Sequence, residues 1–151
     1  MKNEKEIRDF IAAIEPEIEV YFNDEEPTYF DSEDNFINLG YDFHAGSEDC
    51  GFRAHIVRKH GFPAAFDYPI EVWSILHELG HFMTIDDVEL TEEEVLARMI
   101  CKDKTVEEVA ASIELQDLYF DLPLEWEATE WAIDFITTNP EAVNYLVGLV
   151  E

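Results

Sequence analysis

Hydrophobic positions in the first part of the chain form one amphipathic stretch and several short apolar runs. Apolar side chains recur at helical spacing over residues 4–14, which predicts an amphipathic helix that ends near Pro16. The runs at 18–22 and 36–43 are rich in β-branched and aromatic residues, and residues 28–39 are typical of two short strands around an Asp/Ser/Asn turn. We therefore expect a small β-sheet in this part of the chain.

Residues 44–66 interrupt this pattern before a helical region begins. They contain three glycines, one proline and a local group of basic side chains, which favours an irregular connection with room for one short helix. Pro69 then suits the first turn of a helix whose apolar positions extend to Met83. The Thr-x-x-Glu sequences at 91–94 and 105–108 are typical of capping boxes, so two further helices are predicted there.

The remainder of the chain completes a mostly helical pattern. Pro123 suits the start of a helix that runs to about residue 138, and Asn139-Pro140 predicts a last helix with an Asn cap. A chain of 151 residues with 47% hydrophobic content can bury one substantial core. We therefore expect residues 1–151 to form a single α+β domain with a small N-terminal sheet and roughly six helices.

Charge and cysteine content restrict the environment and the partners. With 9 Lys+Arg and 36 Asp+Glu the formal net charge is −27, so phosphate backbones and anionic membranes would repel the chain. The charged first ten residues lack the apolar run of a signal peptide, and Cys50 and Cys101 are too few for a disulfide framework. We expect a cytoplasmic protein that binds neither nucleic acid directly nor membranes. Its acidic surface either only keeps it soluble or attracts a basic protein.

The stretch SILHELGHFMT, residues 74–84, holds the chain's main candidate chemistry. His77 and His81 are four residues apart and share one helix face, while Glu78 lies about 100° round the helix. This H-E-x-x-H arrangement suits two zinc ligands and a general base. Chance spacing is the alternative, but the apolar flanks would make an unpaired polar cluster costly to bury. Gly80 weakens the helix by about 1 kcal/mol relative to Ala, which predicts close approach of another backbone.

A catalytic zinc site needs a third protein ligand, and residues 122–136 offer three glutamates. On a helical wheel the predicted buried stripe comprises Leu124, Ala128, Trp131, Ala132 and Phe135. Glu130 falls on the opposite, solvent side, whereas Glu125 and Glu127 flank the stripe at similar angles. Periodicity therefore excludes Glu130 and leaves Glu125 and Glu127 as alternatives.

The pair of motifs HELGH and EWEATEWAIDF resembles the ImmA/IrrE-type zinc metallopeptidases, over roughly residues 29–136. The resemblance implies a zincin-like fold of the gluzincin type with an active-site H-E-x-x-H helix. It implies Glu125 as the third zinc ligand and places Glu127 at a variable position. Thr129 stands where the family has Asn or Asp, the residue expected to hydrogen-bond a ligand histidine. The family also implies an edge strand that holds an extended substrate peptide.

The resulting hypothesis is a zinc metalloendopeptidase with Glu78 as general base and then general acid. The resemblance implies that its substrate is a helix-turn-helix repressor of a phage or mobile element, a basic DNA-binding regulator. His44, Tyr41 and Arg98 are candidate donors to the oxyanion, although no motif supports them. The alternative is an acidic binding protein, an inactive relative or a nucleic-acid mimic, that sequesters such a regulator. Thr129 and the acidic helices expected at 91–116 motivate this alternative.

Overall fold

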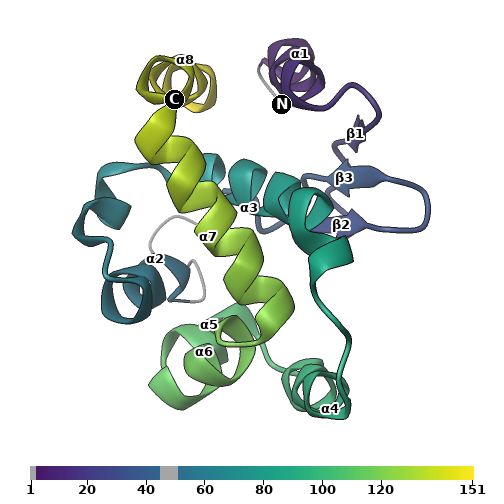
Figure 1. Cartoon of the computed structure of the whole chain (residues 1–151), viewed down its shortest axis with the longest axis vertical. Coiled ribbons are helices and arrows are strands. Elements are labelled where there is room, and N and C mark those ends of the chain that lie inside the picture. The colour runs from purple at the N-terminus through teal and green to yellow at the C-terminus, as the bar shows by residue number, and fades with distance from the viewer. Residues whose placement is uncertain (1–2, 45–50) are drawn as a thin grey trace.

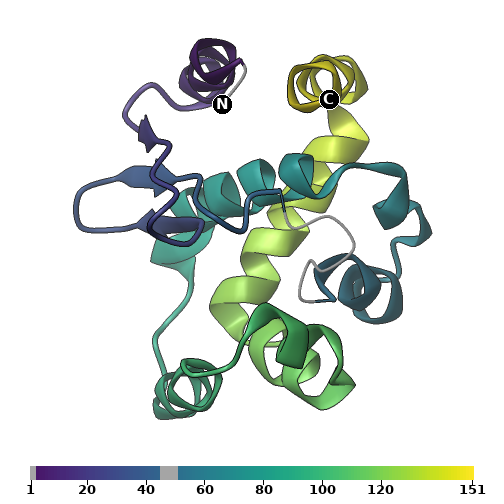
Figure 2. The ribbon, with the colours of Figure 1, turned by 180° about the vertical axis from the view of Figure 1, so that it is seen from behind.

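The computed structural model describes residues 3–44 and 51–151 and has an α+β fold in which helices dominate (Figure 1). Two long helices, α3 (Ile70–Thr84) and α7 (Pro123–Thr138), cross at the centre of the molecule (Figures 1 and 2). The predicted α+β class with a small N-terminal sheet is confirmed. Within the two described ranges, no helix combines the length and apolar character needed to cross a membrane.

The sheet has three short strands: β1 (Glu19–Tyr21), β2 (Tyr29–Asp31) and β3 (Phe36–Asn38). Their order is β1-β3-β2, with β1 parallel and β2 antiparallel to the central strand β3. Ile37 of β3 pairs with Val20 on one side and Phe30 on the other, and its side chain is fully buried. The predicted strands therefore form, and β2 is left as an edge strand.

Strand β3 is shorter than the apolar run 36–43 that predicted it. The chain leaves the sheet at Gly40, where a Cβ atom would lie 1.9 Å from the carbonyl oxygen of Glu26. The backbone N–H of Tyr41 donates to that same carbonyl at 3.0 Å. The segment at Glu26 thus lies directly against the backbone of Gly40, and residues 41–44 form turns instead of continuing the strand.

Helices α3 and α7 approach each other at the backbone level. A Cβ atom at Gly80 would lie 2.3 Å from the carbonyl oxygen of Ala128, a separation that real Cβ atoms do not reach. The close backbone approach predicted from Gly80 is therefore confirmed. Trp73, Leu76 and Leu79 of α3 are fully buried in the core that surrounds this crossing. The crossing fixes the relative positions of all side chains that the two helices carry nearby.

The first and last helices pack together at one end of the molecule (Figures 1 and 2). Helix α1 (Glu4–Ile14) is the predicted amphipathic helix, and α8 (Pro140–Val150) is the predicted last helix. The Asn3 side-chain amide donates to the carbonyl oxygen of Leu149 at 2.8 Å. The start of α1 and the end of α8 are thereby held next to each other.

The predicted Asn cap of α8 is wrong in detail. The Asn139 side chain forms no capping hydrogen bond with α8. Its Nδ2 instead donates backward to the carbonyl oxygen of Phe135 at 3.2 Å and to Thr138 Oγ1 at 2.9 Å. Pro140 still begins the helix, because its fixed φ and missing N–H suit the first turn.

The predicted irregular connection contains more helix than expected. The described part after residue 50 forms the α-helical turn α2 (Phe52–His55), the π-helical turn η2 (Ile56–His60) and the 3₁₀ turn η3 (Pro63–Asp67). Phe52, His55 and Ile56 are buried, so this segment contributes to the core. Residues 45–50, including Cys50, belong to the same predicted connection and lie outside the described residues.

The region between α3 and α7 consists of η4 (Ile85–Asp87), α4 (Glu92–Cys101), α5 (Val106–Ala110) and α6 (Ile113–Phe120). The sequence pattern did not separate α6 from the preceding helix. Its start at Ser112 is marked by a side-chain cap, because Ser112 Oγ accepts a hydrogen bond from the backbone N–H of Leu115 at 3.2 Å. Together with α2, this helix explains why the described chain has eight α-helices instead of about six.

Of the two predicted capping boxes, one forms completely and one forms by half. Thr105 Oγ1 accepts from the backbone N–H of Glu108, and the Glu108 carboxylate accepts from the backbone N–H of Thr105. Thr91 Oγ1 accepts from the backbone N–H of Glu94 at 3.2 Å, as predicted. The Glu94 carboxylate, however, accepts from Arg98 Nη2 at 3.0 Å instead of returning to the cap.

Candidate metal centre

Helix α3 places the two histidines of the H-E-x-x-H motif on one inward face. The rings of His77 and His81 lie with centroids 4.6 Å apart and nearly perpendicular planes. Their side chains are 8% and 13% exposed. The four-residue spacing accounts for this geometry because it returns to the same side of a helix after about one turn. Both Nε2 atoms face the neighbouring helix α7.

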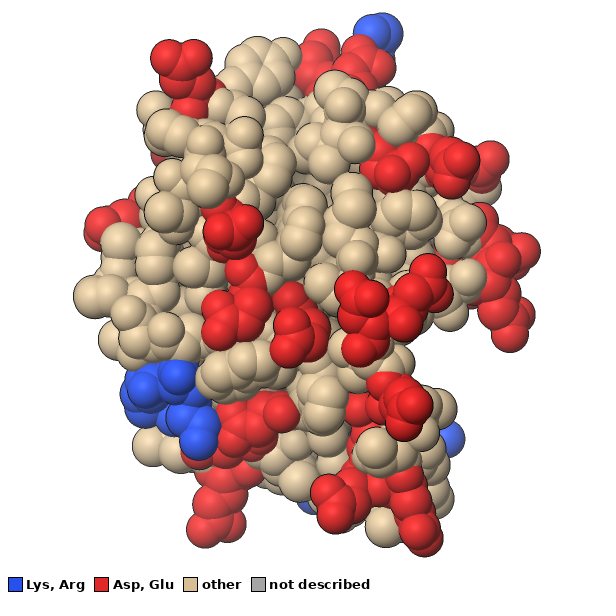
Figure 3. All heavy atoms as spheres, viewed as in Figure 1, with Lys and Arg blue, Asp and Glu red and all other residues tan. Residues whose placement is uncertain are grey.

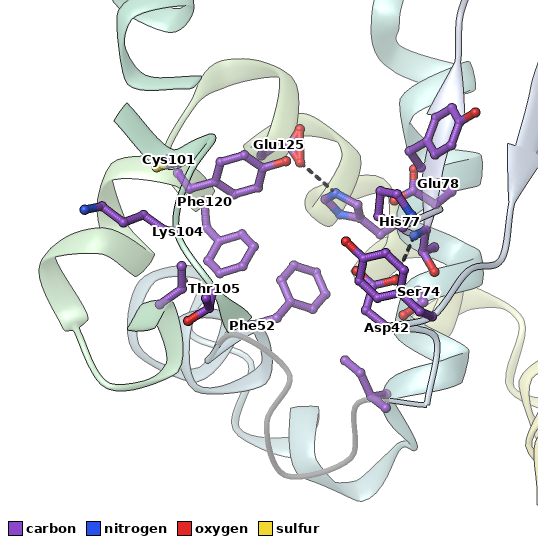
Figure 4. Close-up of a pocket in the computed structure, with 17 residues that line it drawn as sticks. Asp42, Phe52, Ser74, His77, Glu78, Cys101, Lys104, Thr105, Phe120 and Glu125 are labelled. Carbon is purple, nitrogen blue, oxygen red and sulfur yellow. Dashed lines mark hydrogen bonds and ion pairs between the residues drawn. The ribbon is translucent and has the colours of Figure 1, made fainter. Parts of the chain in front are cut away.

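Helix α7 supplies the carboxylate that faces these histidines, and it is that of Glu125. Glu125 Oε1 lies 3.2 Å from His77 Nε2 (Figure 4). Glu125 Oε2 lies 3.1 Å from His81 Nε2. The Glu125 side chain is 4% exposed, whereas Glu127 is exposed to solvent. Glu130 also points outward, as the helical wheel predicted. Of the two alternatives that the wheel left open, the structure brings only Glu125 to the histidines.

The three side chains could hold a metal ion. Their ligand atoms all lie within 4.8 Å of one another. Zinc binds nitrogen and oxygen ligands at about 2.0–2.1 Å in a tetrahedron, so neighbouring ligand atoms are about 3.3 Å apart. The separations of 3.2 and 3.1 Å between the imidazole nitrogens and the carboxylate oxygens are close to this value. Two imidazoles and one carboxylate are also the ligand types that catalytic zinc sites use.

Thr129 lies behind His77, one turn along α7 from Glu125. Thr129 is buried, and its Oγ1 lies 3.1 Å from His77 Nδ1. With the Nδ1 proton donated to Thr129, the Nε2 atom of His77 keeps its lone pair for the ion. Thr129 therefore contacts one of the two motif histidines and could orient its ring if that histidine binds a metal ion. A neutral hydroxyl lends the imidazole less basicity than a carboxylate would.

Charge pairing inside the site shifts the pKa values of Glu125 and His81 more than burial does. Burial would raise the pKa of Glu125, but the nearby imidazoles of His81 and His77 hold it well below its ordinary value. Burial would likewise lower the pKa of His81, but the Glu125 carboxylate, by charge and hydrogen bond, raises it to about 9. Glu125 is thus kept ionised, which is the form that a metal ion requires.

Glu78 lies next to His77 on the wall of a cavity (Figure 4). Its side chain is buried, and burial raises the pKa of its carboxyl group, while the charges of His81 and His77 lower it in part. A carboxyl group with a raised pKa can exchange protons at neutral pH more readily than an ordinary glutamate. This is the environment that general acid–base catalysis requires.

The cavity has a volume of about 440 Å³ and reaches one of the two histidines, His77. His77, Glu78 and Glu125 line it together with residues of β2, of α2 and of the region 101–120. Phe52 and Phe120 lie side by side in its apolar part, with ring centroids 5.1 Å apart (Figure 4). The edge strand β2 forms part of the rim, so an extended chain could lie along it.

The predicted oxyanion donors lie in different places. Tyr41 lines the cavity and is 62% exposed. His44 does not line the cavity, and its Nδ1 pairs with Glu71 Oε2 at 2.8 Å. Arg98 reaches the site from α4, with Nη2 3.1 Å from Glu125 Oε2 and 3.0 Å from Glu94 Oε1. Arg98 therefore contacts the carboxylate of the site and holds a second, fully buried glutamate at the same time.

Sequence reasoning missed Tyr119, which also lines the cavity. The charge of Glu125 and burial raise the pKa of its hydroxyl well above the ordinary value, so this group keeps its proton and can donate it. The guanidinium of Arg98 lies over the tyrosine ring, 5.6 Å from its centroid. No motif marks Tyr119, because it comes from α6 and meets the site only through tertiary packing.

A second group of histidine and carboxylates lies outside this site. His55, Asp117 and Asp121 also place ligand atoms within 4.8 Å of one another. His55 Nε2 lies 2.7 Å from Asp121 Oδ1. Arg58 Nη1 pairs with Asp117 at 3.1 Å, and Lys59 Nζ pairs with Asp121 at 3.3 Å. Both carboxylates of this group are therefore already paired with cations.

Comparison with known proteins gives no relative from which a function could be transferred. No family model, no curated protein and no solved structure matches the chain. The resemblance to the ImmA/IrrE-type metallopeptidases stays a prediction that depends on the two motifs. Any functional conclusion must therefore come from the geometry and chemistry of the site.

Proposed function

We propose that the chain is a zinc-dependent metallopeptidase with a zincin-like active-site helix, and that it hydrolyses a peptide bond in a protein substrate. The observation that carries the proposal is the buried convergence of His77, His81 and Glu125 beside a cavity lined by Glu78. Burying two imidazoles and two carboxylates is costly unless they are paired or bind a metal. A metal ion accounts for all four side chains at once.

In this proposal His77, His81 and Glu125 hold the ion and Glu78 performs the proton transfers. A bound zinc ion would polarise the scissile carbonyl and acidify an attacking water. Glu78 takes the proton from that water as general base and then donates it to the leaving amine as general acid. Its position on the cavity wall and its raised pKa suit both transfers.

The oxyanion that forms at the carbonyl needs a hydrogen-bond donor, and Tyr119 has the best position for it. Its hydroxyl stays protonated, and its side chain lines the cavity beside Glu125. Tyr41 lines the same cavity but is largely exposed, so water weakens the hydrogen bond it could give. The pairing of His44 with Glu71 makes His44 a poorer candidate.

The substrate proposed is a basic protein, and a helix-turn-helix repressor of a phage or mobile element is the example that the motif resemblance implies. A net charge of −27 attracts a partner of opposite sign and accelerates its association. The edge strand β2 at the cavity rim offers backbone groups to an extended segment of such a partner.

A second candidate function is sequestration of the same basic partner without hydrolysis. The contact between Arg98 and Glu125 favours it, because the guanidinium occupies one carboxylate oxygen that a metal ion would need. The hydroxyl of Thr129, where the family has Asn or Asp, points the same way, since it supports its histidine less strongly. An acidic protein of this kind would need no active centre to bind its partner.

Metal content, measured by elemental analysis on protein prepared without chelator or nickel, is the decisive experiment. We expect near one zinc per chain in wild type and Glu127→Ala, and near none in Glu125→Ala, because only Glu125 faces the histidines. Glu78→Gln should keep the metal and lose hydrolysis of a basic protein substrate. No metal in wild type, even after titration with zinc, would refute the peptidase proposal and leave sequestration.

A further inference from the structure

Helix α4 has its apolar side chains on the outside. Four large apolar residues on one face are exposed: Val95 by 42%, Leu96 by 52%, Met99 by 64% and Ile100 by 55%. Spacings of one, four and five residues place them on one side of the helix. A helix at the surface of a globular protein normally turns such a face toward the core. Here the face points to solvent.

The inward face of α4 is held mainly by charge. Glu94 is fully buried and Arg98 is half-buried, and Arg98 joins Glu94 to Glu125 of the metal centre. The only apolar residue that α4 buries is Ala97. The pairing of Arg98 with the site thus determines which side of α4 faces the body. The apolar side is left available for another molecule, as exposed apolar patches usually are at interaction sites.

Acidic side chains surround the start of this face. Asp86, Asp87, Glu89, Glu92 and Glu93 are all exposed along the approach to α4 and its first turn. Acidic groups also gather over the lower right of Figure 3, where Figure 1 places α4. A second copy of this chain would bring another charge of −27 against this rim. Repulsion between like charges therefore disfavours self-association through α4.

We propose that the exposed face of α4 is a docking surface for an amphipathic helix of a basic protein. The apolar stripe of that helix would cover Val95, Leu96, Met99 and Ile100, and its flanking Lys and Arg would pair with the acidic rim. Cys101 at the end of α4 and Lys104 just beyond it line the cavity. A chain that continues from the docked helix would therefore reach the cavity directly. Only this last step rests on the proposed peptidase function.

The test uses full-length Glu78→Gln protein, so that no hydrolysis can interfere, and a fluorescent synthetic helix of leucine and lysine as the probe. Binding is measured by anisotropy at physiological salt, where long-range attraction between exposed charges is screened. Leu96→Ser with Met99→Ser should weaken binding at least about tenfold. The matched control is Phe66→Ser with Tyr145→Ser, because these side chains are similarly exposed, by 58% and 59%, on other elements. The control should leave binding within about twofold.

Equal effects of the two pairs, or no effect of either, would overturn the proposal, because probe binding would then not depend on the α4 face in particular. Val95→Ser with Ile100→Ser tests the same face independently if the first pair fails to fold. A wild-type dimer in sedimentation that the α4 substitutions abolish would also overturn it, in favour of a second copy. Selective loss of probe binding in a protein that holds no metal would support docking while refuting the peptidase function. If the α4 substitutions leave probe binding unchanged, while the same substitutions in protein that keeps Glu78 still allow hydrolysis of a basic protein substrate, docking would be refuted and the peptidase function supported.

Discussion

Two groups of histidine and carboxylate in this molecule satisfy the same distance criterion for a metal site but differ in their surroundings. In the first, His77, His81 and Glu125 are enclosed between α3 and α7. In the second, buried His55 meets Asp117 and Asp121, whose side chains are 31% and 37% exposed. Both groups therefore have ligand atoms close together, so this closeness alone does not show which of them is a metal site.

The difference lies in how each carboxylate is already neutralised. Arg58 and Lys59 pair with both carboxylates of the second group, so a metal ion would have to displace two cations near solvent. In the first group one guanidinium, that of Arg98, contacts one oxygen of Glu125, and two imidazoles face the same carboxylate. From this comparison we expect competing cations, together with the number of imidazoles, to decide which group can take an ion.

Removal of one histidine should produce the largest difference in zinc content between variants of the two groups. His81→Ala takes away a proposed direct ligand, so zinc content should fall from near one ion per chain to near none. Asp121→Asn in the second group should leave zinc content unchanged, because its carboxylate is already paired with Lys59. Elemental analysis on both variants measures this. Loss of zinc in Asp121→Asn alone would reverse the assignment.

In metal-free protein, the two groups should also make the free energy of unfolding depend on pH with opposite signs. The pKa of His81 is raised to about 9, so its contribution to stability is complete below about pH 6.5 and is lost as the pH rises through 9. The size of this loss is roughly 3 kcal/mol. Burial lowers the pKa of His55, so its contribution is present above about pH 6.5 and is lost at lower pH.

Urea unfolding of metal-free protein across this pH range measures both slopes. In His81→Gln the decline toward pH 9 should disappear while the decline below about pH 6.5 remains. A His81→Gln protein with the same alkaline decline as wild type would show that other groups cause it.

The contact between α3 and α7 should matter for the first group only. Gly80→Ala places a methyl group against the carbonyl of Ala128, so we expect a loss of about 1–3 kcal/mol in the free energy of unfolding and weaker zinc binding. Gly148→Ala on α8 meets nothing within 4 Å and should stabilise the protein by up to about 1 kcal/mol. Denaturant titration and zinc titration of the two variants provide the comparison. Unchanged zinc affinity in Gly80→Ala would show that the helix crossing does not set the site.

The smallest effect is expected at Thr129. Thr129→Val keeps the shape but removes the hydroxyl that lies 3.1 Å from His77 Nδ1, so zinc affinity should fall about tenfold. Thr129→Asn should bind zinc at least as tightly as wild type, because an amide oxygen can accept the same hydrogen bond. Competition with a chromogenic chelator measures both affinities. Equal affinities in wild type and Thr129→Val would show that the hydroxyl does not support the ligand histidine.

Local signals in the sequence predicted most of the elements, and the H-E-x-x-H motif named His77, Glu78 and His81, which the structure carries together on α3. Proline positions and the Thr105 capping box located helices correctly, and Gly80 indicated the backbone contact. Helical periodicity did not separate Glu125 from Glu127, because the two residues lie at similar angles on either side of the predicted buried stripe. The structure turns α7 so that Glu125 and Thr129 are buried while Trp131 and Phe135 are only half-buried.

Other parts of the site depend on contacts between distant segments. Arg98 and Tyr119 come from helices with no motif of their own and reach Glu125 only through tertiary packing. The apolar pattern of α4 likewise shows that the helix has two faces, but not which one contacts the body. The inward face is the one that carries Arg98, which pairs with Glu125, 27 positions further along the chain.

The pairing of α1 with α8 has a practical consequence for attaching the protein to other objects. The Asn3 amide joins the start of α1 to the end of α8 at the end of the molecule opposite α4 (Figures 1 and 2). A tether, a fluorescent fusion or a surface linkage at either terminus would therefore leave the α4 face pointing away from the point of attachment. Immobilised protein should keep the access to large partners that the free protein has.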